Sequence, residues 1–210
     1  MIRVFIADDH EIVRQGLIQV VSNSGDITVV GEASSGRETI QELQNNYYDV
    51  ILLDIHLPDM SGLEVLKEII RQRPELCVLV LSMHPEEQYA VRVLKAGASG
   101  YITKGAKHTE LVAAIRRVAS GGKYISPSLA EKLASRLKLN NQEPLHQSLS
   151  DREYEVMLMI ASGKKTREIA EELFLDDSTI HTYRARILRK MRVKSNAELT
   201  RYSIENGLIA

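Results

Sequence analysis

Val50-Ile51-Leu52-Leu53-Asp54 carries the strongest structural signal in the chain, with four apolar residues in a row and then a carboxylate. A strand that is apolar at every position is typical of a parallel sheet with helices on both faces. Similar short apolar runs lie on either side of it, at residues 2–6, 27–30, 77–81 and 100–103. Together these runs predict five strands of one parallel sheet.

The stretches between these runs have the spacing of amphipathic helices. Residues 63–70, for example, place apolar side chains at positions 63, 65, 66, 69 and 70, on one face of a helix. The same spacing predicts helices at residues 12–21, 36–43, 86–95 and 110–119. Strands that alternate with helices predict an α/β fold with a doubly wound parallel sheet, because each crossover must return the chain to the same sheet.

The pattern changes after Gly122. Residues 128–139 have the composition of one helix, and residues 140–144 are polar and turn-prone. Beyond Ser150 every segment has helical spacing. We therefore expect an α/β domain at residues 1–122, a linker helix and flexible linker at 123–146, and an all-α domain at 147–210.

The bulk composition is that of a globular protein. The 210 residues are 44% hydrophobic and 26% charged, which is enough apolar material for two modest cores. No run approaches the roughly 20 apolar residues of a membrane-spanning helix, and the first apolar run is too short for a signal peptide. The single cysteine, Cys77, lies in an apolar run and has no disulfide partner in the chain. These features predict a cytoplasmic protein with no membrane partner.

Polar side chains follow four of the predicted strands. Asp8 and Asp9 follow the first, Asp54 the third, Ser82 the fourth and Lys104 the fifth. Ligands of open α/β sheets bind at the carboxyl ends of the strands, so we expect these side chains to meet at one edge. Clustered carboxylates repel one another unless a cation joins them, and oxygen ligands without sulfur suit Mg²⁺. The alternative for any one aspartate is a simple turn or helix cap.

Such a site has a definite chemistry. A carboxylate beside Mg²⁺ can attack a phosphoryl group and form an acyl phosphate. The metal and Lys104 would neutralise the charge on the phosphoryl oxygens, and Ser82 could donate a hydrogen bond to them. The sequence therefore favours Asp54 or one of its neighbours as an acceptor of phosphate.

These residues are joined by a longer pattern, made of Asp8, Asp9, Asp54, residues 57–62, Ser82, Tyr101 and Lys104. The pattern resembles the receiver domain of two-component response regulators, which has a five-stranded flavodoxin-like fold. The resemblance covers residues 1–122 and implies that Asp54 is the phosphoacceptor and that a sensor histidine kinase is the partner. Gly105 departs from the family, which often has a proline with a cis peptide bond here, so we do not expect a cis bond.

The resemblance also implies the roles of the neighbouring residues. Asp9, Asp54 and the backbone carbonyl of His56 would bind Mg²⁺ directly, and Asp8 would act through a bound water. Ser82 and Tyr101 would be the switch residues that reorient on phosphorylation.

Three histidines, His10, His56 and His84, follow predicted strands near this edge. We interpret them as loop residues at the rim of the pocket. His56 and His84 could tune loss of the phosphate by controlling access of water, and His10 has no assigned role.

The C-terminal domain has the pattern of a helix-turn-helix. Ser150 followed by Glu153 is a capping box, and Thr166 is a candidate cap for the next helix. A third helix starts near 176–178, and residues 178–194 contain 6 basic residues and no acid. Two short helices and then a basic helix indicate DNA binding; the alternatives are a solvated face or a membrane-surface helix. In the third helix Ile180, Ile187 and Met191 share a face and should pack inward.

The domain resembles LuxR-type DNA-binding domains, through Leu149-Ser150, Arg152-Glu153, Ile169-Ala170-Glu171, Ser178-Thr179-Ile180, the run 187–191 and Gly207-Leu208-Ile209. With the receiver pattern, this is similar to response regulators of the NarL/FixJ type. The resemblance makes residues 179–190 the recognition helix. It implies base contacts by His181, Thr182 and Ala185, and phosphate contacts by Lys165, Thr166, Thr179 and Lys190. The family has a lysine where this chain has His181, so no relative's target sequence transfers.

We therefore interpret the chain as a phosphorylation-dependent transcription regulator, not an enzyme. Phosphorylation would release the DNA-binding domain and promote a homodimer on double-stranded DNA, with RNA polymerase as a further candidate partner. The last helix, residues 196–205, has Ala197, Leu199, Tyr202 and Ile204 as its apolar residues. This face is either the dimer contact or packs on its own domain. The rival functions are a metal-dependent phosphatase or phosphotransferase, and a receiver that signals without phosphorylation.

Overall fold

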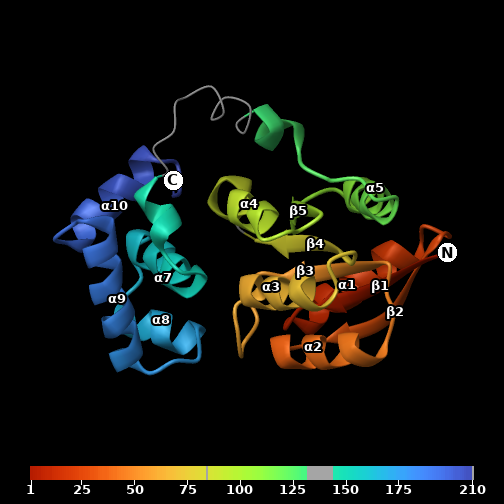
Figure 1. The fold of residues 1–210 in the computed structure, drawn as a ribbon, viewed down its shortest axis with the longest axis horizontal. Coiled ribbons are helices and arrows are strands. Elements are labelled where there is room, and N and C mark those ends of the chain that lie inside the picture. Colours follow the sequence, from red (N-terminus) through yellow and green to blue (C-terminus); the bar gives the residue numbers. More distant parts are fainter. Residues whose placement is uncertain (84, 132–143, 210) are drawn as a thin grey trace. The chain divides into compact units, whose positions relative to one another are not determined.

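The computed structural model describes residues 1–83, 85–131 and 144–209 (Figure 1). The chain divides into two compact units, Met1–Ala134 and Ser135–Ala210. Each unit has its own buried core and is described by itself below.

The first unit is built on one five-stranded sheet, which confirms the predicted α/β fold. The strands are β1 (Ile2–Ala7), β2 (Ile27–Ala33), β3 (Val50–Asp54), β4 (Cys77–Ser82) and β5 (Gly100–Thr103). They lie in the order β2-β1-β3-β4-β5, and every neighbouring pair is parallel. β2 extends past the predicted end at residue 30, because Gly31 pairs with Phe5 and Ala33 with Ala7 of β1.

Helices cover both faces of this sheet (Figure 1). They are α1 (Glu11–Ser22), α2 (Gly36–Asn45), α3 (Gly62–Gln72), α4 (Glu86–Lys95) and α5 (His108–Ala119). Leu111, Ile115 and Val118 of α5 share one core with alternate residues of the strands, and α1 packs on the same core. The strand β3 is buried at every position, as its continuous apolar run predicts.

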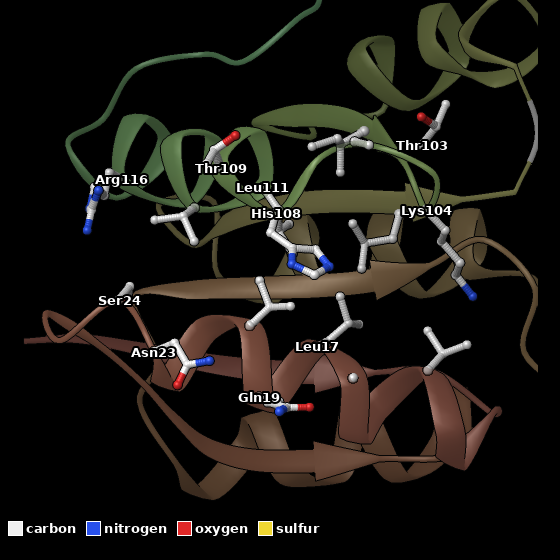
Figure 2. A pocket seen from close by; sticks show the side chains of 17 residues that line it. Leu17, Gln19, Asn23, Ser24, Thr103, Lys104, His108, Thr109, Leu111 and Arg116 are labelled. Atoms are coloured by element: carbon white, nitrogen blue, oxygen red, sulfur yellow. The ribbon is translucent and has the colours of Figure 1, made fainter.

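A cavity of about 650 Å³ lies between α1 and α5, with Leu81 and Ile102 of the sheet among its lining residues. Figure 2 shows Lys104 at the end of this cavity near the carboxyl ends of the strands and Arg116 at the opposite end. Arg116 donates hydrogen bonds to both carboxylate oxygens of Asp26, at 2.8 and 2.7 Å.

All the regular secondary structure in the described residues of the second unit is helical. It contains the short 3-10 helix η1 (Leu145–Ser148) and the helices α7 (Asp151–Ala161), α8 (Thr166–Glu172), α9 (Asp177–Met191) and α10 (Asn196–Glu205). The capping box of Ser150 and Glu153 is present. The expectation for Thr166 was wrong by one residue: Lys165 precedes α8, and its backbone N–H donates to Glu168.

The segment between the two units is described only in part. Residues 127–131 are helical, in line with the start of the predicted helix at 128–139. The rest of that helix, and most of the predicted linker at 140–144, lies outside the described residues. None of the described helices is long and apolar enough to cross a membrane.

Candidate functional site

Asp54 ends β3 at the centre of the sheet, and its side chain is almost fully buried. Its Oδ2 lies 2.7 Å from Lys104 Nζ, and its Oδ1 accepts a hydrogen bond of 3.3 Å from the backbone N–H of His56. Burial raises the pKa of Asp54 to about 6, although the ammonium of Lys104 opposes the shift. The central carboxylate of the pocket has therefore lost most of its hydration, and Lys104 compensates for only part of that loss.

Lys104 joins two of the buried carboxylates. Its backbone N–H donates to the carbonyl of Ser82 at 2.8 Å, which fixes the loop after β5 against the end of β4. Its Nζ lies 2.6 Å from Asp8 Oδ2 as well as 2.7 Å from Asp54 Oδ2. Burial alone would lower the pKa of Lys104, but Asp54 and Asp8 outweigh burial and raise it, so the group stays charged.

The loop after β1 adds two more acids. Asp8 is fully buried, and its Oδ1 accepts a hydrogen bond of 2.9 Å from the backbone N–H of His10. Asp9 Oδ1 is buried and has no hydrogen-bond partner among the described residues. Side-chain ligand atoms of Asp8, Asp9, His10 and Asp54 all lie within 4.8 Å of one another. This set of mainly carboxylate oxygens, in which neither Asp8 Oδ2 nor Asp9 Oδ1 makes a hydrogen bond to a described residue, fits a hard divalent cation.

Ser82 and Tyr101 come from neighbouring strands and are both fully buried. Asp54 of β3 pairs with Leu81 of β4, and Ser82 is the next and last residue of β4. Tyr101 pairs with Val80 in the next strand. The sheet register thus brings the hydroxyl of Ser82 to the same edge as Asp54 and places Tyr101 further down the neighbouring strand.

Three supporting residues were not predicted. Asp59 accepts hydrogen bonds from the backbone N–H groups of Gly36 and Arg37, at 2.8 and 2.9 Å, and so ties the loop after β3 to the start of α2. Arg14 donates to the carbonyl of Asp8 at 2.8 Å. A Cβ atom on Gly62 would lie 2.0 Å from the carbonyl oxygen of Asp54, so only glycine fits there. The stretch 57–62 pointed to this loop, but not to these contacts.

The basic helix α9 has two distinct faces. Ile180, Ile187 and Met191 are buried against the rest of the helical unit, as the sequence predicts. His181, Thr182 and Ala185 are exposed, and their spacing places them along one side of the helix. Lys165 is exposed at the start of α8, and Thr166 and Thr179 are partly exposed. The predicted DNA-contacting residues thus include an exposed row on α9.

Comparison with known proteins decides the family. Residues 4–116 match the response regulator receiver domain, and residues 147–203 match the luxR family of bacterial regulatory proteins. The chain is a two-component response regulator of the NarL/FixJ type.

Full-length relatives agree with this assignment. The response regulator UvrY of Escherichia coli (strain K12) is 39% identical over 209 residues, which are 99% of this chain and 96% of the relative. GacA of Pseudomonas aeruginosa is 36% identical, over 100% of this chain and 98% of the relative. A structure of RcsB from Salmonella enterica serovar Typhimurium, bound to a promoter with a phosphomimetic, has a TM-score of 0.67 and 26% identity, over 96% of this chain and 97% of that one.

Lys190, which was predicted to contact DNA phosphate, forms an ion pair inside its own unit of this response regulator. Its Nζ lies 2.5 Å from Oε2 of Glu153, the nearly buried glutamate of the α7 capping box. Burial alone would raise the pKa of Glu153, but Lys190 and the backbone N–H of Ser150 outweigh it and lower the pKa. Lys190 therefore joins α9 to the start of α7.

The apolar residues of α10 divide between two sides. Leu199 is fully buried, and the hydroxyl of Tyr202 lies 2.9 Å from Nδ1 of His146 in η1. Ala197 is exposed, and the side chain of Ile204 is 54% exposed. Leu199 and Tyr202 thus pack within the domain, and Ala197 and Ile204 remain on the outer side of the helix.

Proposed function

We propose that Asp54 accepts a phosphoryl group in the presence of Mg²⁺, and that this releases the DNA-binding unit, promotes dimerisation and strengthens operator binding. The observation that supports this proposal most is the cluster of three carboxylates, two of them buried and in contact with Lys104, in a chain that also carries an exposed row of side chains on a basic helix. The proposed phosphoryl donor is a cognate sensor histidine kinase, or a small acyl phosphate in its place. RNA polymerase is a further proposed partner on DNA.

The chemistry follows from the contacts of Asp54. An oxygen of Asp54 attacks phosphorus, and the bond from phosphorus to the donor's imidazole nitrogen, or to the acetate oxygen of acetyl phosphate, breaks with its electron pair on the leaving group. Lys104, whose Nζ already lies 2.7 Å from Asp54 Oδ2, stays within reach of the phosphoryl oxygens and stabilises their charge. Ser82, buried at the same edge, donates its hydroxyl hydrogen to one of these oxygens.

The acids of the pocket supply the metal site. Asp9, Asp54 and the backbone carbonyl of His56 would hold Mg²⁺ directly, and Asp8 would hold it through a water. A bound Mg²⁺ would supply positive charge that joins the carboxylates and the incoming phosphoryl group. The single ammonium of Lys104 is shared by Asp8 and Asp54. The three carboxylates therefore keep an excess of negative charge, which the cation would balance.

Ser82 and Tyr101 are proposed to carry the signal away from Asp54. Movement of Ser82 toward the phosphate would open space along β4 and β5, into which the buried ring of Tyr101 could turn. That movement would change the surface of the receiver unit without unfolding it. The equilibrium between the held and the released states of the DNA-binding unit would shift with it.

On DNA, α9 is the proposed recognition helix. His181, Thr182 and Ala185 would face base edges, while Lys165, Thr166, Thr179 and Lys190 would contact phosphates. A single unit of this size contacts few base pairs, so two copies on adjacent half-sites gain affinity through effective concentration. The outer side of α10, with Ala197 and Ile204, is the proposed contact between the two copies.

Intact-mass analysis of the full chain with acetyl phosphate tests the phosphoacceptor. The parent should gain one phosphoryl group only when Mg²⁺ is present, and Asp54→Asn should gain none, because the amide is not a nucleophile. Asp49→Asn is a control, since Asp49 lies at the other end of β3 from Asp54, where it accepts a hydrogen bond from the backbone N–H of Arg3. Labelling of Asp54→Asn to the level of the parent would show that the acceptor is another residue.

Light scattering with beryllium fluoride and Mg²⁺ tests the link to dimerisation. The parent should double in mass, and Asp54→Asn should not respond. On a two-half-site operator, Ile204→Asp should remain folded but lose cooperative binding by about tenfold or more. Tyr202→Phe is the matched control, because it removes only the hydroxyl that contacts His146. Parent-like cooperativity of a folded Ile204→Asp variant would exclude α10 as the dimer contact.

A further inference from the structure

His10 occupies an unusual position at the start of α1. It is the N-cap residue of the helix, yet its side chain makes no capping hydrogen bond. Ser, Thr, Asp and Asn are the residues that usually cap at this position. The backbone of His10 is held instead by Asp8, whose Oδ1 accepts its N–H at 2.9 Å. The hydrogen bond to Asp8 therefore fixes the backbone of His10, while its imidazole makes no hydrogen bond that caps the helix.

The imidazole points at the acids of the pocket. Its Nδ1 lies 2.6 Å from Asp9 Oδ1 and 3.7 Å from Asp8 Oδ1. Asp9 Oδ1 nevertheless has no hydrogen-bond partner among the described residues, so the short contact lacks hydrogen-bond geometry. Neighbouring ligands of an octahedral ion with bonds near 2.1 Å lie about 3 Å apart, so the two atoms would need to separate by only a few tenths of an ångström to bind one cation.

We propose that Nδ1 of His10 is a further ligand of the divalent cation in this pocket, and that it makes the pocket prefer Mn²⁺ to Mg²⁺. The inference rests on the metal site of the proposed function and adds to it a nitrogen donor. Mg²⁺ favours oxygen ligands and keeps its waters, whereas affinity for a site that contains nitrogen rises along the first transition series. His10 would therefore strengthen Mn²⁺ binding and leave Mg²⁺ binding nearly unchanged.

The simpler alternative is that His10 only holds Asp9 in place. The side chain of His10 is 67% exposed and that of Asp9 29%, so an ion pair between them would contribute little. As a positioning residue, His10 would affect the binding of every cation that Asp9 ligates. As a ligand, it would affect mainly the cations that accept nitrogen. The ratio of Mn²⁺ to Mg²⁺ affinity therefore separates the two roles.

The experiment uses the unphosphorylated full chain, with Mn²⁺ as the probe. Electron paramagnetic resonance of free Mn²⁺ gives its affinity, and competition gives that of Mg²⁺. The parent should bind Mn²⁺ about tenfold more tightly than Mg²⁺, and His10→Ala should remove most of this difference by weakening Mn²⁺ alone. Electron spin-echo modulation should show a directly bound ¹⁴N in the parent and none in His10→Ala. His108→Ala is the control, because His108 is exposed outside the cluster and should change neither signal.

Two results would overturn the inference while leaving the proposed metal site intact. One is an equal loss of Mn²⁺ and Mg²⁺ affinity in His10→Ala, and the other is a parent spectrum without bound ¹⁴N. A parent that binds neither cation would overturn both the inference and the proposed metal site. If circular dichroism shows His10→Ala to be unfolded, His10→Gln replaces it, because an amide oxygen keeps the length of the side chain but gives no directly bound ¹⁴N.

Discussion

The two units treat buried carboxylates in opposite ways. In the helical unit each of two buried glutamates has its own cation, with Lys190 2.5 Å from Glu153 and Arg152 2.7 Å from Glu155. In the receiver unit Asp8 and Asp54 share the single ammonium of Lys104. Asp9 adds a further negative charge to the same cluster. The helical unit is therefore balanced at each buried acid, and the receiver pocket keeps an excess of negative charge.

The pKa shifts follow this difference. Burial raises the pKa of Asp54 to about 6, because Lys104 is shared and Asp8 lies close by. Burial acts in the same direction on Glu153, but its own lysine and the N–H of Ser150 outweigh burial and lower the pKa. A complete buried pair leaves no charge uncompensated, whereas a buried cluster with more acids than cations is prepared to bind a further cation. The difference in charge balance thus distinguishes the ion pair of Glu153 and Lys190, which is a structural contact, from the acidic pocket, which is a candidate cation site.

Removal of Lys104 should have the largest effect on stability. Lys104→Met leaves Asp8 and Asp54 buried without their shared cation, and the free energy of unfolding without metal should fall by about 3 kcal/mol. Added Mg²⁺ should recover much of this loss, since the more negative pocket has a greater need for a cation. Urea unfolding with and without Mg²⁺ measures both effects. Lys107→Met is the control, as Lys107 is exposed on the same loop, and an equal loss in both variants would contradict the role of Lys104.

Loss of one partner from the balanced pair should cost less. Lys190→Met should lower the free energy of unfolding by roughly 1–2 kcal/mol at pH 7, because Lys190 is partly exposed and Glu153 keeps its bond to Ser150. The folded-state pKa of Glu153 is lowered, so the pair stabilises the fold above the ordinary glutamate pKa and stops doing so as the pH falls through the folded-state value. Unfolding curves from pH 7 to pH 3 should therefore show the parent and the variant converging in acid. A constant difference across this range would exclude the ion pair as its cause.

Removal of both charges of the pair should have the smallest effect. Glu153→Gln with Lys190→Met should return stability to within about 0.5 kcal/mol of the parent, because glutamine also completes a capping box. If Lys190 also contacts DNA phosphate, the stable double variant should still bind DNA more weakly on all sequences, with the salt dependence reduced by about one counterion. Fluorescence anisotropy at several salt concentrations measures this. Parent-like binding by the double variant would restrict Lys190 to its contact with Glu153.

Local patterns in the sequence were enough to predict the five strands, the capping box of α7 and the inward face of α9. They also placed Asp8, Asp9, Asp54 and Lys104 at one edge, because parallel strands carry the residues after their ends to the same side of the sheet. These features depend on spacing within a few residues, or on a topology that a simple alternation of strands and helices defines. Such information is present in the order of the residues alone.

Other features arise only when distant segments meet. The partner of Lys190 lies 37 residues away at Glu153, and the partner of Tyr202 lies 56 residues away at His146. The approach of Nδ1 of His10 to Asp9 depends on rotamers in the packed loop, although the two residues are neighbours in the chain. A side chain's sequence spacing shows which face of a helix it occupies, but its contact energy depends on the group that packing brings opposite it. The sequence therefore specified the elements and the chemistry of the pocket, and tertiary packing selected which charges became paired, which stayed exposed and which were left for a ligand.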